Sequence, residues 1–211
     1  MPRAGIERPG RTLRRLLWGL AVVALLVGGR GRAETDTYSG TSLGGVPAPD
    51  FRLTDQTGRL VSLSDYRGRV VLLTFMDGHC KDVCPLTLRT MGELQSLLGA
   101  DAERVALVAV SVDPWLDEVG RPAAIAQEDP AHAPRRWDFL TGTLDELRPV
   151  WAAYHVSVVE QLIGTYGANG EHDTGFFLID ARGRERFYIQ SDADENMILR
   201  RIRSLLKEGG G

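Results

Sequence analysis

Cysteine is scarce in this chain, and so is positive charge beyond the first 33 residues. The 211 residues include two cysteines, Cys80 and Cys84, so thiol chemistry depends on this one pair. Residues 34–211 carry 18 Lys and Arg against 27 Asp and Glu, a net charge of −9. We expect no nucleic-acid binding from such an acidic body. The composition, 43% hydrophobic and 25% charged, is that of one ordinary globular domain.

A hydrophobic run long enough to span a membrane is also missing at the N-terminus. The uncharged apolar run at residues 16–29 has fourteen residues, whereas a spanning helix usually needs about 20. Five arginines precede it and a small-x-small cleavage site follows, so residues 1–33 are predicted to be a cleaved signal peptide rather than an N-terminal membrane anchor. No cysteine follows this segment for lipid attachment. The folded part is expected outside the cytoplasm, on the periplasmic face of the cell membrane.

The rest of the chain divides by composition. Residues 34–46 are rich in Gly, Ser and Thr and are predicted to be a linker, although residues 41–45 could equally begin the fold. Residues 47–207 form the expected domain, and residues 208–211 a flexible tail. Apolar periodicity in the domain predicts these strands and helices: a hairpin of 51–54 and 60–63, a strand at 70–76, a helix at 86–98, a buried strand at 104–112, a short helix at 123–128, a strand at 137–140, a helix at 144–154, an irregular hairpin at 156–166, a closing hairpin of 175–180 and 186–189, and a helix at 194–207.

These elements predict an α/β fold of the thioredoxin-like type. Strands alternate with helices, and an antiparallel hairpin and a last helix close the chain. The central mixed sheet would be flanked by helices and preceded by a β-hairpin. Sites in open α/β sheets lie at the carboxyl ends of strands, which is where the two cysteines fall.

The segment Asp77-Gly78-His79-Cys80-Lys81-Asp82-Val83-Cys84-Pro85 places both cysteines between a strand and a helix. At such a turn the helix dipole and the unpaired backbone N–H groups should lower the pKa of the first thiol. Residues four apart on a helix face the same way, so Cys80 and Cys84 can close a disulfide or bind one soft metal ion. Both alternatives stay open at this point. Two thiolates alone leave a metal ion short of ligands, so a third ligand should come from elsewhere.

His172 is the candidate for that third ligand. It lies in a polar loop immediately before the strand that contains Phe176-Phe177-Leu178-Ile179. In a thioredoxin-like sheet this loop faces the cysteine turn. Two sulfur atoms and one imidazole nitrogen suit Cu(I), and with an added donor Cu(II), although ligand type alone does not exclude zinc.

The other three histidines have less to recommend them as ligands. His79 is adjacent to Cys80, which puts its side chain on another face of the turn, so we expect it to tune the thiolate. His132 lies beside a proline-rich loop and His155 at a helix end. We expect both of these to be solvated or satisfied locally.

Several of these segments together resemble the Sco/SenC family of copper-binding assembly proteins. The resemblance spans about residues 47–206 and is carried by Cys80-Lys81-Asp82-Val83-Cys84-Pro85, Ser111-Val112-Asp113-Pro114, Phe139-Leu140-Thr141-Gly142, and His172 six residues before Leu178-Ile179-Asp180. It implies one copper ion, Cu(I) or Cu(II), bound by Cys80, Cys84 and His172. It also implies delivery of copper, or of reducing equivalents, to the binuclear copper centre of cytochrome c oxidase.

The resemblance extends to partners and location. The expected partner is the copper-centre subunit of the oxidase, with another copper carrier or a thioredoxin-like reductant as further candidates. Family members are commonly held to the membrane by an N-terminal anchor, which reverses the preference for cleavage after residue 33. Membrane association through the N-terminal segment is therefore expected.

The chain departs from the family pattern just before the first cysteine. An aromatic residue and Thr are usual there, whereas this chain has Met76-Asp77-Gly78-His79. An anion at Asp77 would raise the pKa of the thiols and favour a bound cation. The loop before Gly175 lacks the proline that thioredoxins keep there, which weakens the case for a general dithiol reductase.

Three alternatives to a copper chaperone use the same cysteines. An extracytoplasmic thiol-disulfide oxidoreductase would use Cys80 and Cys84 as the redox pair and would not need His172. A structural disulfide would close a very small loop, which stabilises little, and it would sit at an exposed helix start. A peroxidase of the peroxiredoxin kind would need a Thr-x-x-Cys site, which neither cysteine has. The metallochaperone is the favoured hypothesis, because it alone gives His172 a function.

Overall fold

The computed structural model describes residues 40–81, 83–119, 123–158 and 175–209. The chain divides into two compact units, Met1–Thr37 and Tyr38–Gly211, and all described residues belong to the second. Among the helices of these residues, none has the length and apolar character needed to cross a membrane.

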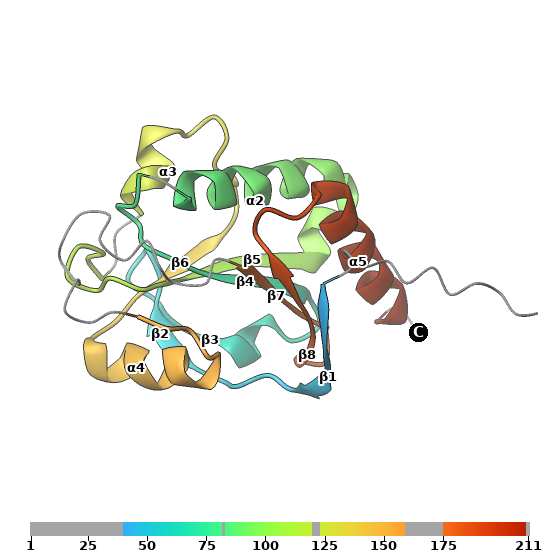
Figure 1. Cartoon of the computed structure of the whole chain (residues 1–211), viewed down its shortest axis with the longest axis horizontal. Helices are drawn as coiled ribbons and strands as arrows, with labels where there is room; N and C mark the ends of the chain where they lie inside the picture. Colours follow the sequence, from blue (N-terminus) through green and yellow to red (C-terminus); the bar gives the residue numbers. More distant parts are fainter. Residues whose placement is uncertain (1–39, 82, 120–122, 159–174, 210–211) are drawn as a thin grey trace, which may run out of the picture. The chain divides into compact units, whose positions relative to one another are not determined.

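A six-stranded mixed sheet forms the centre of the second unit (Figure 1). Its strand order is β1-β8-β7-β4-β5-β6. The strands are β1 (Thr41–Pro47), β4 (Val70–Met76), β5 (Val105–Ser111), β6 (Asp138–Leu140), β7 (Gly175–Ile179) and β8 (Arg184–Gln190). Strands β4, β5 and β6 run parallel, whereas β7 is antiparallel to β4 and β8, and β1 is antiparallel to β8. The arrangement places β4, the strand that leads to the cysteines, inside the sheet.

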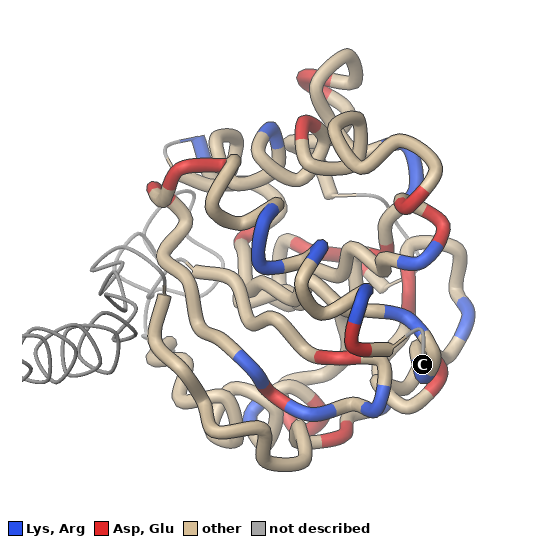
Figure 2. The backbone as a smooth tube through the Cα atoms, turned by 90° about the vertical axis from the view of Figure 1, so that its right-hand side faces the viewer, with Lys and Arg blue, Asp and Glu red and all other residues tan. Residues whose placement is uncertain are grey.

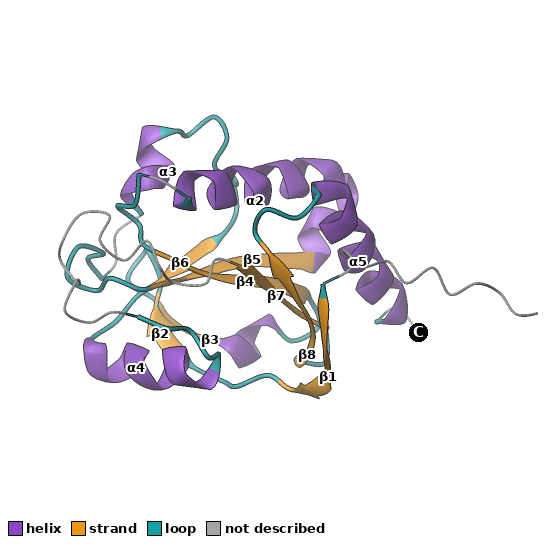
Figure 3. Ribbon diagram, viewed as in Figure 1, coloured by secondary structure: helices purple, strands orange, loops and turns teal. Residues whose placement is uncertain are grey.

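Helices cover both faces of this sheet (Figure 3). The helices are α2 (Cys84–Leu98), α3 (Ala124–Glu128), α4 (Leu144–Ala153) and α5 (Glu195–Glu208), with short 3-10 helices η1 (Leu63–Tyr66) and η2 (Gly99–Arg104). In the view of Figure 1, α2, α3 and α5 lie above the sheet and α4 lies below it. The hairpin of β2 (Arg52–Thr54) and β3 (Leu60–Ser62) forms a second, two-stranded sheet, and Thr54 bridges to Thr141 just after β6.

Strand β4 is buried at all seven positions, because its two faces pack into two different hydrophobic cores. Leu72 and Met76 point into the core formed with α2 and α5, whereas Leu73 and Phe75 point into the core formed with η1 and α4. A strand covered on both faces reads as a continuous apolar run rather than an alternating one. Strand β5 is buried in the same way and pairs with β4 from Val70↔Val105 to Met76↔Ser111.

Local sequence signals explain where the helices begin. Pro85 occupies the first turn of α2, where its missing N–H costs no hydrogen bond. At α4, the Thr143 N–H donates to the Glu146 carboxylate at 2.8 Å, as the capping-box pattern predicts. Asp194 caps α5 by accepting a hydrogen bond from the Asn196 N–H at 3.1 Å.

Charged residues are interspersed over the side of the unit that carries the C-terminus (Figure 2). Arg186 illustrates the mixing, because its guanidinium contacts both Asp180 at 3.1 Å and Glu208 at 2.8 Å. Basic and acidic side chains therefore lie next to one another on this side of the unit.

Most of the predicted elements are confirmed. The N-terminal hairpin, the buried strands, the closing hairpin and the helices at 144–154 and 194–207 agree with the structure to within a few residues. Residues 41–47 form β1 and so begin the fold, the second of the two alternatives for this segment. The irregular hairpin at 156–166 is not seen at residues 156–158, which form no strand, and its remainder lies outside the described residues.

Candidate metal and thiol site

The two cysteines lie where β4 ends and α2 begins. Strand β4 ends at Met76, the chain turns with a hydrogen bond from the Cys80 N–H to the Asp77 carbonyl at 3.3 Å, and α2 starts at Cys84. The Val112 N–H donates to the Met76 carbonyl at 3.1 Å, so the loop after β5 runs beside this turn. The predicted strand-to-helix turn at the carboxyl end of the parallel strands is confirmed.

Cys80 and Cys84 lie together but not on one helix. The helix begins at Cys84, so Cys80 belongs to the preceding turn, and the prediction that both face the same way four residues apart on a helix was wrong. A hydrogen bond nevertheless joins the two side chains. The two cysteines are not joined by a disulfide. The contact comes from the curled turn rather than from helical periodicity.

Contact with Cys80 and burial together raise the pKa of Cys84. The hydrogen bond with Cys80, removal from water and the negative charge of Asp77 raise the pKa of the Cys84 thiol, and a hydrogen bond with the Asp77 backbone only partly opposes them. Cys80 is 3% exposed and Cys84 is fully buried. The prediction that the cysteines lie at an exposed helix start was therefore wrong. The expected helix-dipole lowering concerned the first thiol, Cys80, and stays a prediction. Asp77 raises the thiol pKa, as its charge predicts.

Asp117 contacts Gly78 and His79 in the turn that carries the cysteines. Its carboxylate accepts hydrogen bonds from the Gly78 N–H at 3.1 Å and from the Ser111 hydroxyl at 2.7 Å, and it lies 3.2 Å from the His79 Nδ1 atom. Burial raises the pKa of Asp117 to about 6, and the charge of Asp77 adds to the rise, whereas the hydrogen bonds and His79 oppose it. This buried carboxylate therefore ties the end of β5 to the cysteine turn.

Sequence reasoning missed Asp117 and the role of Ser111. Ser111 belongs to a segment that carried the family resemblance, but Asp117 follows it by six residues in a loop without periodicity. The Ser111 hydroxyl accepts from the Asp113 N–H at 3.1 Å, and the Ser111 carbonyl accepts from the Trp151 indole N–H at 2.9 Å. The sequence signal that could have indicated these residues was the group of polar residues at the end of the apolar run that forms β5.

The four histidines differ in their surroundings. His172 lies outside the described residues, so its predicted place as third ligand stays a prediction. His79 is partly exposed and contacts Asp117, and its expected effect on the thiolate stays a prediction. His132 contacts Asp129 at 2.8 Å, which confirms that it is satisfied locally, and His155 follows the end of α4.

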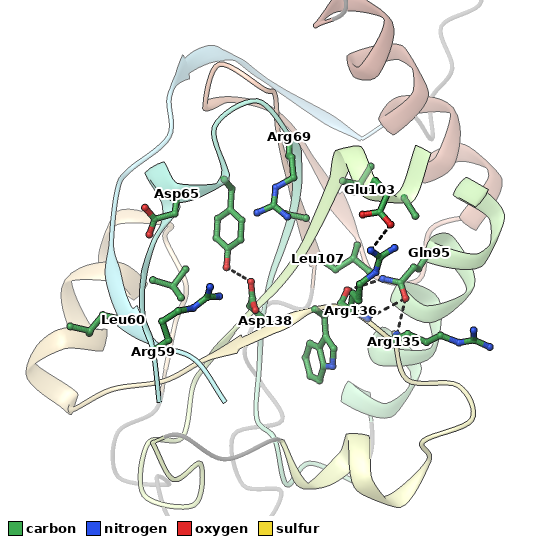
Figure 4. A pocket seen from close by; sticks show the side chains of 16 residues that line it. Arg59, Leu60, Asp65, Arg69, Gln95, Glu103, Leu107, Arg135, Arg136 and Asp138 are labelled. Carbon is green, nitrogen blue, oxygen red and sulfur yellow. Dashed lines mark hydrogen bonds and ion pairs between the residues drawn. The ribbon is translucent and has the colours of Figure 1, made fainter. Parts of the chain in front are cut away.

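A cavity of about 580 Å³ lies at the other end of the parallel strands, around the starts of β5 and β6 (Figure 4). The Tyr66 hydroxyl donates to Asp138 at 2.6 Å, and Arg136 pairs with Glu103 across it. Neither cysteine lines this cavity. It lies away from the carboxyl ends of the parallel strands, where sites of open α/β sheets occur, so the thiol site is the candidate functional site.

Comparison with known proteins gives consistent matches. The sequence model of the SCO1/SenC family matches residues 41–207. An SCO2-like protein of Rickettsia felis is 26% identical over 159 residues, which cover 70% of this chain and 72% of the relative. A SCO1/SenC family lipoprotein from Bacillus anthracis has a similar structure, with a TM-score of 0.65 and 25% identity over 79% of this chain and 98% of that one.

A structure with a bound metal is also among the matches. Bradyrhizobium japonicum ScoI, solved with copper bound, has a TM-score of 0.62 and 26% identity, covering 76% of this chain and 99% of that one. These matches confirm the expected thioredoxin-like α/β fold with a mixed sheet flanked by helices and a small hairpin. The family match includes every described element from β1 to α5, so the chain belongs to the SCO1/SenC family.

Proposed function

We propose that this protein is a copper metallochaperone that binds one copper ion through Cys80, Cys84 and His172. It delivers the ion to the binuclear copper centre of cytochrome c oxidase. The observation that carries the proposal is the pair of adjoining thiols at the end of β4 in a member of the SCO1/SenC family. The copper bound in Bradyrhizobium japonicum ScoI supports copper as the ion.

The donor chemistry fits copper as cargo. Two thiolates are soft ligands that favour Cu(I), and an imidazole nitrogen from His172 would extend the set toward Cu(II). Because its surroundings keep Cys84 protonated, copper must displace a proton when it binds, and its affinity should rise with pH. The burial of both sulfur atoms would keep the bound ion away from water.

The cellular location of the protein is inferred from its N-terminal sequence and from one similar protein. An arginine-rich apolar segment precedes the domain, and the similar Bacillus anthracis protein is a lipoprotein. The protein therefore acts outside the cytoplasm at the periplasmic face of the cell membrane, where the copper-centre subunit of the oxidase is its client. Another copper carrier would load it.

A thiol-disulfide oxidoreductase is the second candidate function. The hydrogen bond between Cys80 and Cys84 places their sulfur atoms close enough to form a disulfide with small movements. In this role the dithiol passes two electrons and two protons to a disulfide of the oxidase copper site. A thioredoxin-like reductant would then restore the dithiol.

Copper binding by wild type and His172→Ala, side by side, tests the ligand assignment. We expect one ion per wild-type chain with thiolate-to-Cu(II) charge-transfer absorption, and about a 10–100-fold loss of affinity in the variant, as for removal of a metal-site group. His132→Ala is the matched control, because that exposed histidine is engaged with Asp129. Equal affinity in wild type and His172→Ala would remove His172 as a ligand, and failure of wild type to bind copper would favour the oxidoreductase.

A further inference from the structure

Beside the thiols lies a second set of metal-binding groups. One ligand atom from each of Asp77, His79 and Asp117 lies within 4.8 Å of the other two. Such spacing lets one ion reach all three, because bonds from first-row metals to nitrogen or oxygen are about 2.0–2.2 Å long. None of the three is a ligand in the proposed sulfur site.

The fold builds this cluster from two distant segments. Asp77 and His79 come from the turn after β4, and Asp117 comes from the loop after β5. Their approach depends on Gly78, because a Cβ atom at that position would overlap the Asp117 carboxylate. The Gly78 N–H donates to Asp117, and the His79 N–H donates to the Asp77 carboxylate at 2.8 Å. The backbone itself therefore holds the two carboxylates in place.

The imidazole of His79 faces one of the two carboxylates. His79 Nδ1 lies 3.2 Å from Asp117, whose side chain is fully buried. An ion between them would take this nitrogen and a carboxylate oxygen as ligands, and both donor types suit Cu(II). His132 and Asp129 form a similar pair at 2.8 Å, but both side chains are about half exposed and belong to no such cluster among the described residues.

Charge also favours a cation here. The Asp77 and Asp117 residues are 1% and 3% exposed, so two carboxylates share a site from which water is largely excluded. Buried like charges repel one another, and the imidazole of His79 is the basic side chain that contacts Asp117 there. A divalent ion would balance both carboxylates at once.

We propose that Asp77, His79 and Asp117 form a second metal position, separate from the thiol site, that takes Cu(II) through one imidazole nitrogen and carboxylate oxygens. Nitrogen and oxygen donors suit Cu(II), whereas the thiolates suit Cu(I). The position goes beyond the proposed function and does not depend on it. An ion held there would lie next to the turn that carries Cys80.

Removal of both thiols isolates this position. In purified Cys80→Ser/Cys84→Ser protein titrated with Cu(II), we expect one bound ion whose electron paramagnetic resonance spectrum shows nitrogen coupling, without thiolate charge-transfer absorption. Adding His79→Ala should weaken binding at least about tenfold and remove the nitrogen coupling. Adding Asp77→Asn should weaken binding in the same direction. Adding His132→Ala is the matched control and should change neither quantity.

The outcomes distinguish this second metal position from the thiol site. A folded double variant that binds no Cu(II), or binds it equally well with His79→Ala, overturns the second position. So does loss of binding with His172→Ala in the same background, because the ion would then belong to the His172 site. The copper titration of wild type against His172→Ala tests the thiol site on its own, so either site can fail while the other stands. Circular dichroism of each variant confirms that the fold is kept.

Discussion

Contacts of individual side chains determine the pKa of the Cys84 thiol. Cys84 is fully buried and hydrogen-bonded to Cys80, and these contacts raise its pKa instead of lowering it. A thiol in such a site is less reactive than one exposed at a helix N-terminus. A metal ion or a client that engages Cys84 must therefore displace its proton.

Asp55 shows how a buried carboxylate stabilises the fold outside the site. Its carboxylate accepts hydrogen bonds from the Thr57 N–H at 2.8 Å, the Thr57 hydroxyl at 2.6 Å and the Arg59 N–H at 2.9 Å. Burial alone would raise its pKa, but these hydrogen bonds outweigh burial and hold the pKa of Asp55 below its usual value. The carboxylate thereby fixes the turn between β2 and β3.

Asp55→Asn should lower the free energy of unfolding at neutral pH by about 1–3 kcal/mol, because it replaces a charged acceptor by an amide. A lowered folded-state pKa means that this contribution is present above the unfolded pKa and is lost as pH falls through the folded one. Urea unfolding across pH measures the difference, which should shrink at acid pH below 3.8. The exposed Asp145→Asn is the control, and a difference from wild type that does not depend on pH would contradict the account.

At the scale of elements, α2 is fitted closely to the loop that follows α3. A methyl group at Gly92 would overlap the His132 carbonyl, although Gly92 lies inside a regular helix. A glycine in a helix usually costs about 1 kcal/mol relative to alanine. Its presence here reflects the close approach of the loop and not a weakness of the helix.

Gly92→Ala should therefore destabilise the protein by about 1–3 kcal/mol, the usual cost of overpacking, despite the better helix propensity of alanine. Thermal unfolding of the variant measures this. Ser96→Ala, on the exposed side of the same helix, should change stability by less than about 0.5 kcal/mol. A raised melting temperature for Gly92→Ala would show that propensity outweighs the contact.

The positions of strands and helices can be predicted from this sequence better than the contacts between side chains. The apolar runs at Val70–Met76 and Val105–Ser111 predicted β4 and β5 correctly, because burial on both faces leaves no polar interruption. The start of α2 was misjudged by two residues, since Cys84 and Pro85 read equally well as turn residues. That difference places Cys84 rather than Leu86 at the start of the helix, with Cys80 in the turn before it.

At the scale of the whole molecule, the sheet order assembles the site. Parallel pairing of β4 with β5 aligns Met76 with Ser111, which brings Asp117 to Gly78 and His79. These partners are almost 40 residues apart in the sequence, so local periodicity could not pair them. The cysteine pair was predictable because its two members are four residues apart and the chain has no others, whereas Asp117 has no local pattern. The position of His172 relative to the thiols stays a prediction.

Copper transfer is the most direct test of the central claim. Copper-loaded protein would be mixed with the reduced, copper-free domain of the oxidase subunit that holds the binuclear centre, and copper in each protein measured after separation. We predict that copper leaves this chain and that the absorption spectrum of the binuclear centre appears, but not with Cys84→Ser as donor. Copper that stays on this chain, while the metal-free dithiol reduces a disulfide of the client, would contradict the chaperone role and establish the oxidoreductase instead.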